Sequence, residues 1–347
     1  MAQSNLLPGV PSGPPRRRPP IGRAPQRGSG KTYAAIDLGT NNCRLLIARA
    51  EKDGFVVVDA FSRIVRLGEG LSASGELSEA AIGRAIAALS VCASKLKRRR
   101  VSLVRSVATE ACRSAGNGAA FVDRVRRETG ILLDVIPASE EARLAVLGCH
   151  VLIEPGEGPA LVFDIGGGST ELVLVQPDDE EPEILAWFSA PWGVVSLTES
   201  EPAHDDSAAA RIAAYDRMKA KVAESFADFA RRLPRSGSMR LLGTSGTVTT
   251  LASVHLDLPC YDRKMVDGAR VPAAAMRAIG ARLAAQSVPE RAREPCIGEE
   301  RADLVVAGCA ILDTILDLWP SPMVTVADRG IREGILRGLM AQGERFS

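Results

Sequence analysis

Two short segments of the sequence combine an aspartate with glycines and small polar residues, and each lies between apolar runs. The first segment is Ala35–Asn41 and the second is Phe163–Glu171. Both follow a strand–Asp–x–Gly–turn–strand pattern, and their aspartates, Asp37 and Asp164, lie 127 positions apart. That spacing is too long for a solenoid repeat and is typical of two related domains.

The residue types in these two turns predict phosphate binding. Glycines let backbone N–H groups approach a phosphate closely, and hydroxyl or amide groups donate further hydrogen bonds. An aspartate would repel a phosphate unless a cation such as Mg²⁺, which prefers oxygen ligands, lay between them. We therefore predict a magnesium site at Asp37, Asp164 and Glu171, and phosphate contacts at Gly39, Thr40, Asn41, Gly166, Gly167, Gly168, Ser169 and Thr170. The alternative is two ordinary tight hairpins, in which Gly, Asp and Asn are common.

A third turn follows the apolar run that ends at Leu242. It contains Gly243, Thr244, Ser245 and Gly246 and precedes a helical pattern. Because N–H groups at a helix N-terminus favour anions, this turn is a further predicted phosphate site, although a simple helix cap is the alternative. By contrast, Gly28–Thr32 only resembles the end of a P-loop, since the glycine that the motif requires is replaced by Pro25.

Arg44 lies three residues after Asn41, on the strand that leaves the first turn. Strand alternation places it on one face with Asn42. If this face borders the substrate, Arg44 can contact a second phosphate group. If it borders solvent, Arg44 is an ordinary surface residue.

The composition excludes several classes of protein. The net charge is +1, so no global field attracts nucleic acid or a membrane surface. No apolar run approaches the roughly 20 residues of a membrane span, and the N-terminus lacks the apolar core of a signal peptide. The seven cysteines include no C-x-x-C pair and no spacing typical of zinc sites. We predict a cytoplasmic protein with reduced thiols that binds no nucleic acid and no membrane.

Residues 1–30 are rich in proline and glycine and contain an arginine run, which predicts a disordered basic tail. Beyond residue 30, apolar strand patterns alternate with amphipathic helical patterns, which is typical of the α/β class. The predicted helices are Ser78–Leu96, Ala119–Thr129, Glu140–Val151, Ala208–Arg232, Ala273–Ala285, Ala302–Leu318 and Ile331–Met340. The predicted strands are Tyr33–Asp37, Cys43–Ala50, Phe55–Val65, Val101–Val107, Ile131–Ile136, Leu161–Asp164, Leu172–Val175, Met239–Leu242 and Met323–Ala327.

These turns, with several further stretches, resemble the exopolyphosphatase / guanosine pentaphosphate phosphatase family of the actin-like ATPase superfamily. The further stretches are Arg66–Leu71, Ala108–Arg113, Glu140–Leu144 and Asp328–Gly334. The resemblance implies two actin-like (ribonuclease-H-like) domains with a cleft between them. We predict domain I at 31–137 plus 329–347 and domain II at 138–328.

The resemblance also implies roles for two residues. Glu141 is expected to be the catalytic base that activates water, whereas the residue pattern alone also fits an acid at a helix N-terminus. Arg113 is expected to contact the transferred phosphate, and a surface ion pair is its alternative. A homodimer is implied as well.

We therefore predict a Mg²⁺-assisted hydrolase that removes the terminal phosphate of polyphosphate, with guanosine pentaphosphate as the alternative substrate. Longer family members carry additional helical domains, so a weaker grip on a long polymer is expected. The remoter alternatives are an ATP-dependent kinase of a small molecule, and a binding protein or filament subunit without activity.

Overall fold

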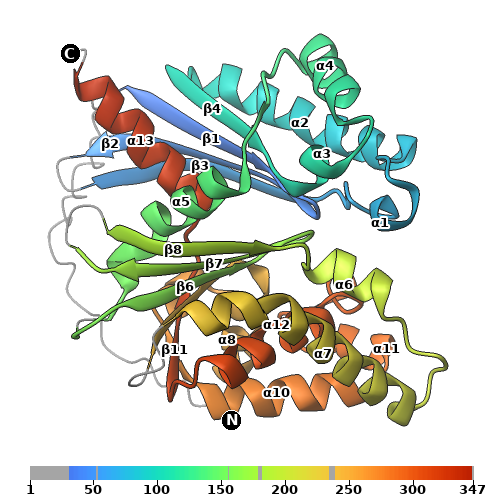
Figure 1. Ribbon diagram of the computed structural model, residues 1–347. Coiled ribbons are helices and arrows are strands. Elements are labelled where there is room, and N and C mark those ends of the chain that lie inside the picture. The colour runs from blue at the N-terminus through green and yellow to red at the C-terminus, as the bar shows by residue number, and fades with distance from the viewer. Residues whose placement is uncertain (1–30, 52–53, 155, 179–181, 234–238, 346–347) are drawn as a thin grey trace, which may run out of the picture. The chain divides into compact units, whose positions relative to one another are not determined.

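The computed structural model describes residues 31–51, 54–154, 156–178, 182–233 and 239–345. The predicted tail at 1–30 lies outside this part of the chain. The described residues contain two sheets (Figure 1). The first sheet has the order β3 (Gly54–Ile64), β2 (Asn42–Glu51), β1 (Thr32–Leu38), β4 (Leu103–Ala108) and β5 (Asp134–Val135).

Alternation along the strands separates the two faces of this sheet. Ile36, Leu45 and Ile47 pack with α2 (Glu79–Arg99), while Ala35, Leu46 and Ala48 pack on the opposite face. As predicted, Ser78 caps α2 and accepts a hydrogen bond from the Ala81 N–H. The other helices on this side are α1 (Leu71–Ser74), α3 (Glu110–Ser114) and α4 (Gly118–Thr129).

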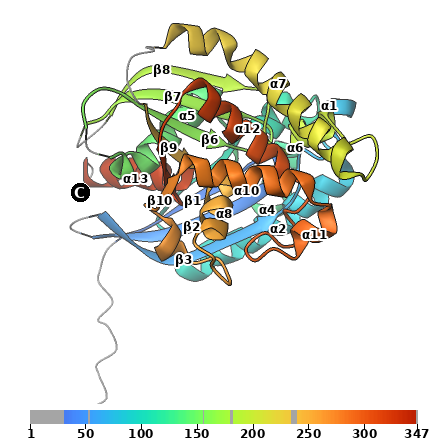
Figure 2. The ribbon, with the colours of Figure 1, turned by 90° about the horizontal axis from the view of Figure 1, so that it is seen from below.

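The second sheet has the order β10 (Arg270–Pro272), β11 (Met323–Ala327), β9 (Arg240–Thr244), β6 (Ala160–Ile165), β7 (Thr170–Gln176) and β8 (Glu183–Ala190). Its helices are α6 (Val194–Ser200), α7 (Ala208–Arg232), α8 (Gly246–His255), α9 (Arg263–Val266), α10 (Ala273–Ala285), α11 (Val288–Ala292) and α12 (Val305–Leu318). Helices α7, α10 and α12 lie side by side on one face of the sheet, over the largest apolar core (Figures 1 and 2).

The two sheets repeat one topology. Strands β3-β2-β1-β4-β5 correspond in order and direction to β8-β7-β6-β9-β11, and β10 is an addition at the edge. The register repeats as well, because Asp37 pairs with Arg44 and Arg44 with Ser62, while Asp164 pairs with Glu171 and Glu171 with Ser189. Every corresponding pair is 127 positions apart. The predicted α/β class with two related halves is confirmed.

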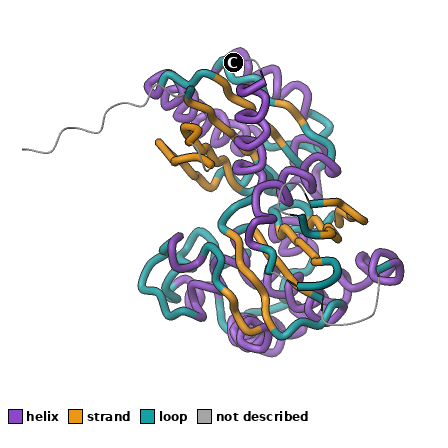
Figure 3. Tube along the Cα trace, turned by 90° about the vertical axis from the view of Figure 1, so that its left-hand side faces the viewer, coloured by secondary structure: helices purple, strands orange, loops and turns teal. Residues whose placement is uncertain are grey.

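Two helices connect the sheets, α5 (Ala138–Cys149) and α13 (Ile331–Arg345). Leu144 and Ala145 of α5 pack with α13 against the first sheet, whereas Ala142 and Val146 pack against the second. In Figure 3 the strands of both sheets are flanked by helices. Residues 31–347 cluster as one unit, in which the predicted domain boundaries stay a prediction.

Several element predictions need correction. The helix predicted at Glu140–Val151 begins at Ala138, because Pro137 before it has the extended backbone of an N-cap. Only Asp134–Val135 of the strand predicted at Ile131–Ile136 pair in the sheet, since Ile131 and Leu133 are buried among helices. The helix predicted from Ala302 begins at Val305. Strand β8 and the shorter helices had not been predicted.

The contact between α5 and α13 depends on glycine and can be tested. A Cβ atom on Gly334 would lie 2.1 Å from the Leu144 carbonyl oxygen, whereas one on Gly338, a turn later, would meet nothing within 4 Å. We expect Gly334→Ala to lower the free energy of unfolding by about 1–3 kcal/mol through overpacking. Gly338→Ala should raise it by about 0.5–1 kcal/mol. Urea denaturation measures both, and equal effects would refute the proposed close contact.

Candidate active site

The first glycine turn joins β1 to β2 and is fixed by backbone hydrogen bonds. The Gly39 N–H donates to the Asn42 carbonyl at 2.9 Å and closes the turn. The Asn41 carbonyl accepts from the N–H groups of Val65 and Arg66 at 2.8 and 3.0 Å. Thr40 and Asn41 are both buried. The segment after β3 therefore fixes the conformation of the first turn.

The second turn repeats this geometry between β6 and β7. The Gly166 N–H donates to the Ser169 carbonyl at 3.0 Å, three residues ahead as in the first turn. A Cβ atom on Gly167 would lie 2.9 Å from Thr40 Cβ, and one on Gly168 would lie 2.7 Å from Thr40 Oγ1. The two turns are thus in contact, and this contact has no room for larger residues.

The third turn connects β9 to α8. Ser245 has a φ of 83°, in the left-handed region, and precedes the first residue of α8, Gly246. Its side chain lies beside the Asp164 carboxyl group and lowers the pKa of that group against the effect of burial. The N–H groups that open α8 therefore begin beside the second aspartate.

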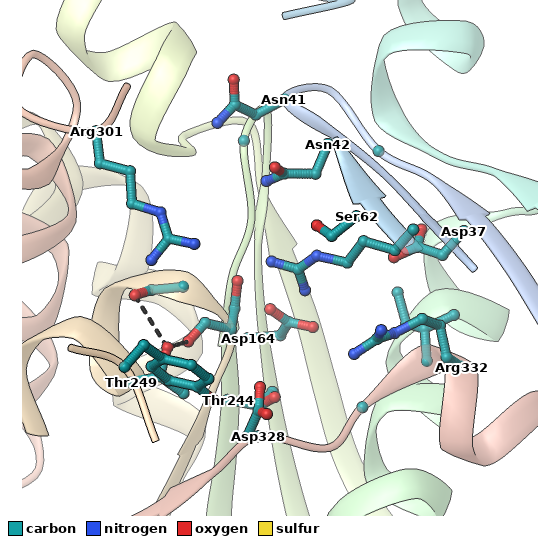
Figure 4. Close-up of a pocket in the computed structure, with 18 of the residues that line it drawn as sticks. Asp37, Asn41, Asn42, Ser62, Asp164, Thr244, Thr249, Arg301, Asp328 and Arg332 are labelled. Atoms are coloured by element: carbon teal, nitrogen blue, oxygen red, sulfur yellow. Dashed lines mark hydrogen bonds between the residues drawn. The ribbon is translucent and has the colours of Figure 1, made fainter. Parts of the chain in front are cut away.

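A cavity of about 770 Å³ lies where the three turns meet (Figure 4). Among the predicted site residues, it is lined by Asp37, Gly39, Thr40, Asn41, Arg44, Glu141, Asp164, Gly167, Gly168, Ser169, Thr244, Ser245 and Gly246. The structure thus brings together most of the residues that the sequence pattern selects, from three separate turns and α5.

Five predicted site residues do not line this cavity: Arg113, Gly166, Thr170, Glu171 and Gly243. Thr170 is buried and its hydroxyl donates to the Trp192 carbonyl at 2.7 Å. A Cβ atom on Gly243 would meet the Phe163 ring at 2.5 Å, so this glycine permits packing behind the site. Gly166 lines a smaller adjoining cavity of about 70 Å³.

The acidic residues of the site lie close to one another, with Glu141 and Glu171 buried and Asp37 and Asp164 half-buried. Burial raises the pKa of Asp164 to about 6, although Arg44 opposes the shift. Burial likewise raises the pKa of Asp37, and it raises that of Glu171 well above the usual value. Glu141 and Asp164 add to the shift at Glu171 by repulsion between like charges. Such a cluster of desolvated carboxyl groups attracts a cation.

Arg44 provides positive charge in this cluster. It pairs with Asp37 in the hairpin register and lines the cavity, so its strand face borders the cavity and not the bulk solvent. It lowers the pKa of both Asp37 and Asp164 against the effect of burial.

Glu141 lies at the first turn of α5 and is 6% exposed. Its Oε2 accepts from Arg113 Nη1 at 2.7 Å, and Arg113 also donates to Glu110 and to the Ile136 carbonyl. Burial raises the pKa of Glu141 to about 7, against the effect of Arg113. In this arrangement Arg113 orients Glu141 from outside the cavity.

Four further arginines line the cavity: Arg263, Arg301, Arg329 and Arg332. Arg301 and Arg332 reach toward it from opposite sides (Figure 4). Arg329 and Arg332 belong to a stretch that carries the family resemblance, and this was the one signal that could have selected them. Nothing in the local pattern around Arg263 or Arg301 predicts a site, because each reaches the cavity only through the tertiary fold.

The buried position of Glu141 predicts a pH dependence of stability. Its pKa is raised in the folded protein, so in the metal-free protein this residue contributes stability below about pH 4.5 that is lost as the pH rises to about 7. We expect the unfolding free energy of the wild type minus that of Glu141→Gln to fall across this range. Glu140 is the control, because Arg143 and Arg105 lower its pKa, so the corresponding difference for Glu140→Gln should rise with pH. Urea titrations at a series of pH values measure both, and slopes of the same sign would contradict the assignment.

Comparison with known proteins identifies the family. A sequence profile of the Ppx/GppA phosphatase family matches residues 46–342. Exopolyphosphatase 2 of Mycobacterium tuberculosis is 31% identical over 88% of this chain and 98% of its own length. A guanosine-5'-triphosphate,3'-diphosphate pyrophosphatase of Aeromonas salmonicida is 29% identical over 89% of this chain, which spans 59% of that protein.

A solved structure agrees with these relatives. The crystal structure of an exopolyphosphatase from Cytophaga hutchinsonii has a TM-score of 0.81 and 26% identity, covering 90% of this chain and 98% of that one. The resemblance found in the sequence and the predicted actin-like α/β fold are confirmed. The chain belongs to the Ppx/GppA phosphatase family.

Proposed function

We propose that this protein hydrolyses the terminal phosphate of inorganic polyphosphate. As a member of a phosphatase family the chain is a phosphohydrolase, and a relative named exopolyphosphatase matches over nearly its whole length. The observation that carries the proposal is the meeting of three glycine turns, several arginines and a buried glutamate around one cavity. Backbone N–H groups and arginines neutralise a phosphate chain, and a carboxylate activates water.

Guanosine pentaphosphate is the second candidate substrate. Tyr261 lines the same cavity and is 43% exposed. An exposed aromatic ring offers a stacking surface for a nucleobase, which polyphosphate does not need. The relative named guanosine-5'-triphosphate,3'-diphosphate pyrophosphatase also supports guanosine pentaphosphate as a candidate substrate.

Glu141 is the proposed general base. A carboxyl group with a pKa near 7 accepts a proton well at neutral pH, and this one borders the cavity. Arg113 fixes the carboxylate, so that Oε1 is left to take the proton of the attacking water. The N–H groups of the glycine turns stabilise negative charge on the phosphoryl oxygens.

Magnesium fits the residues that are present. Asp37 and Asp164 supply oxygen ligands at the cavity wall, and Glu171 lies behind them near Asp164. Among the described residues no group of three or more acidic, histidine or cysteine side chains could hold a metal ion. A site with two carboxylates is typical of Mg²⁺, which binds through one or two carboxylates together with waters and phosphates. When bound, the ion would offset the charge of the substrate.

No helix in the described part of the chain is long and apolar enough to cross a membrane. The predicted homodimer and cytoplasmic location stay predictions.

The role of Glu141 can be tested against its neighbour. Glu141→Gln should lower the rate of phosphate release by about 10²–10⁴-fold with binding largely kept, because only the proton acceptor is lost. Glu140→Gln is the matched control, since Glu140 pairs with Arg105 and Arg143 and does not line the cavity. Phosphate release from long-chain polyphosphate and from guanosine pentaphosphate, each with Mg²⁺, measures the effect.

The faster substrate of the wild type identifies the enzyme. Equal rates for Glu141→Gln and wild type would exclude Glu141 as the base. A wild type that releases no phosphate from either substrate would overturn the proposed function.

The magnesium assignment is tested without turnover. Mg²⁺ should raise the melting temperature of the wild type, because ligand binding to the folded state stabilises it. Asp164→Asn should lose most of this rise. Asp123→Asn, at an exposed position of α4, should keep it. An equal Mg²⁺-dependent rise in all three proteins, measured by thermal unfolding, would place the ion elsewhere.

A further inference from the structure

An ion pair joins the two halves of the protein beside the cavity. Arg66, after β3, donates through Nη1 to Asp303 Oδ2 at 2.7 Å and through Nη2 to Asp303 Oδ1 at 3.2 Å. Nη2 also lies 3.3 Å from the Glu300 carbonyl oxygen. Asp303 precedes α12, so a forked contact of this kind connects segments that are more than 230 residues apart in the sequence.

The backbone of Arg66 is strained, and hydrogen bonds hold it in place. Its φ is 46°, a left-handed conformation that costs a residue other than glycine free energy. The Arg66 N–H donates to the Asn41 carbonyl, and the Arg66 carbonyl accepts from Arg84 Nη2 at 3.1 Å. One end of the ion pair is therefore attached directly to the first glycine turn.

Arg301 lies two residues before Asp303, the acidic partner of the ion pair. This residue lies between Glu300 and Asp303, the two residues that Arg66 contacts. Its guanidinium lines the cavity and points into it (Figure 4), and Nη1 donates to Thr250 at 3.2 Å. Arg301 and Asn41 also line a smaller adjoining cavity. The buried Oδ1 of Asn41 has no hydrogen-bond partner among the described residues. The ion pair thus connects two groups that face one cavity from different halves.

We propose that the Arg66–Asp303 pair is a clasp that sets the position of Arg301 relative to the first glycine turn, which makes Arg66 a positioning residue for the phosphate chain. This inference rests on the proposed function. Both partners are about one third exposed, at 32% and 33%, so solvent screens the pair and it adds little to the stability of the fold. Its effect should appear in substrate binding.

The kinetic test uses Arg66→Gln and Asp303→Asn with long-chain polyphosphate. Each should raise KM by about fivefold to tenfold, within the range of coupling between contacting residues, and leave kcat within about twofold. The double variant should be no worse than either single one. The control is Glu79→Gln, which removes an Arg124–Glu79 ion pair of 2.8 Å that lies wholly within the first half and should leave KM unchanged.

A second comparison tests whether the clasp acts through Arg301. Arg66→Gln should have little further effect on KM in an Arg301→Gln background. The same fold-change in both backgrounds would overturn the proposal, and so would an unchanged KM in both single variants.

A third measurement needs no substrate. Hydrogen exchange should become faster at the amides of residues 301–305 in Arg66→Gln, because the Arg301 and Ala302 N–H groups donate to the Gly298 carbonyl and those of Leu304 and Val305 donate to the Arg301 carbonyl. Glu79→Gln should not change it. Unchanged exchange in Arg66→Gln would refute the clasp even if the protein proves inactive on polyphosphate, whereas inactivity alone would refute only the proposed function.

Discussion

The close contact between the two glycine turns is the constraint on which the site depends. Thr40 of one turn touches Gly167 and Gly168 of the other at distances that exclude a Cβ atom. A larger residue at either glycine would push the two sheets apart, and Asp37 would separate from Asp164. Because the turns meet without intervening side chains, two strands from different sheets present their carboxyl groups to one cavity.

The same constraint explains the electrostatics. Four carboxyl groups lie close together at and behind the cavity wall, and burial raises the pKa of each of them. Such an arrangement is unfavourable in the empty protein and becomes favourable when a cation and a polyanion enter together. Residues of a site commonly reduce stability in this way, while packing elsewhere compensates.

Much of this could be predicted from local patterns. The Asp–x–Gly turns between apolar strands located both halves of the site, and the strand register extends their 127-residue repeat as far as Ser62 and Ser189. Strand β8 was missed because its residues Ile184–Phe188 form a continuous apolar run, although their burial alternates, and α6 was missed because it has only seven residues. Arg301 and Arg263 could not be predicted, since each reaches the cavity through contacts between residues far apart in the sequence. Arg113 had been expected at the phosphate; it lies outside the cavity and hydrogen-bonds to three partners, of which Glu110 is a local i,i+3 neighbour whereas Ile136 and Glu141 are distant in the sequence.

The repeated register has a consequence for the direction of binding. Arg44 and Glu171 occupy corresponding positions in the two hairpins, yet one is a cation and the other a buried acid, and of the two only Arg44 lines the cavity. Two hairpins with the same strand register therefore present different charges to the cavity. A linear polyanion whose two ends are chemically alike would meet unequal charges along the cavity. Its two ends would therefore become inequivalent once it is bound. One half of the repeated framework thus supplies a cation to the cavity at a position where the other half supplies none.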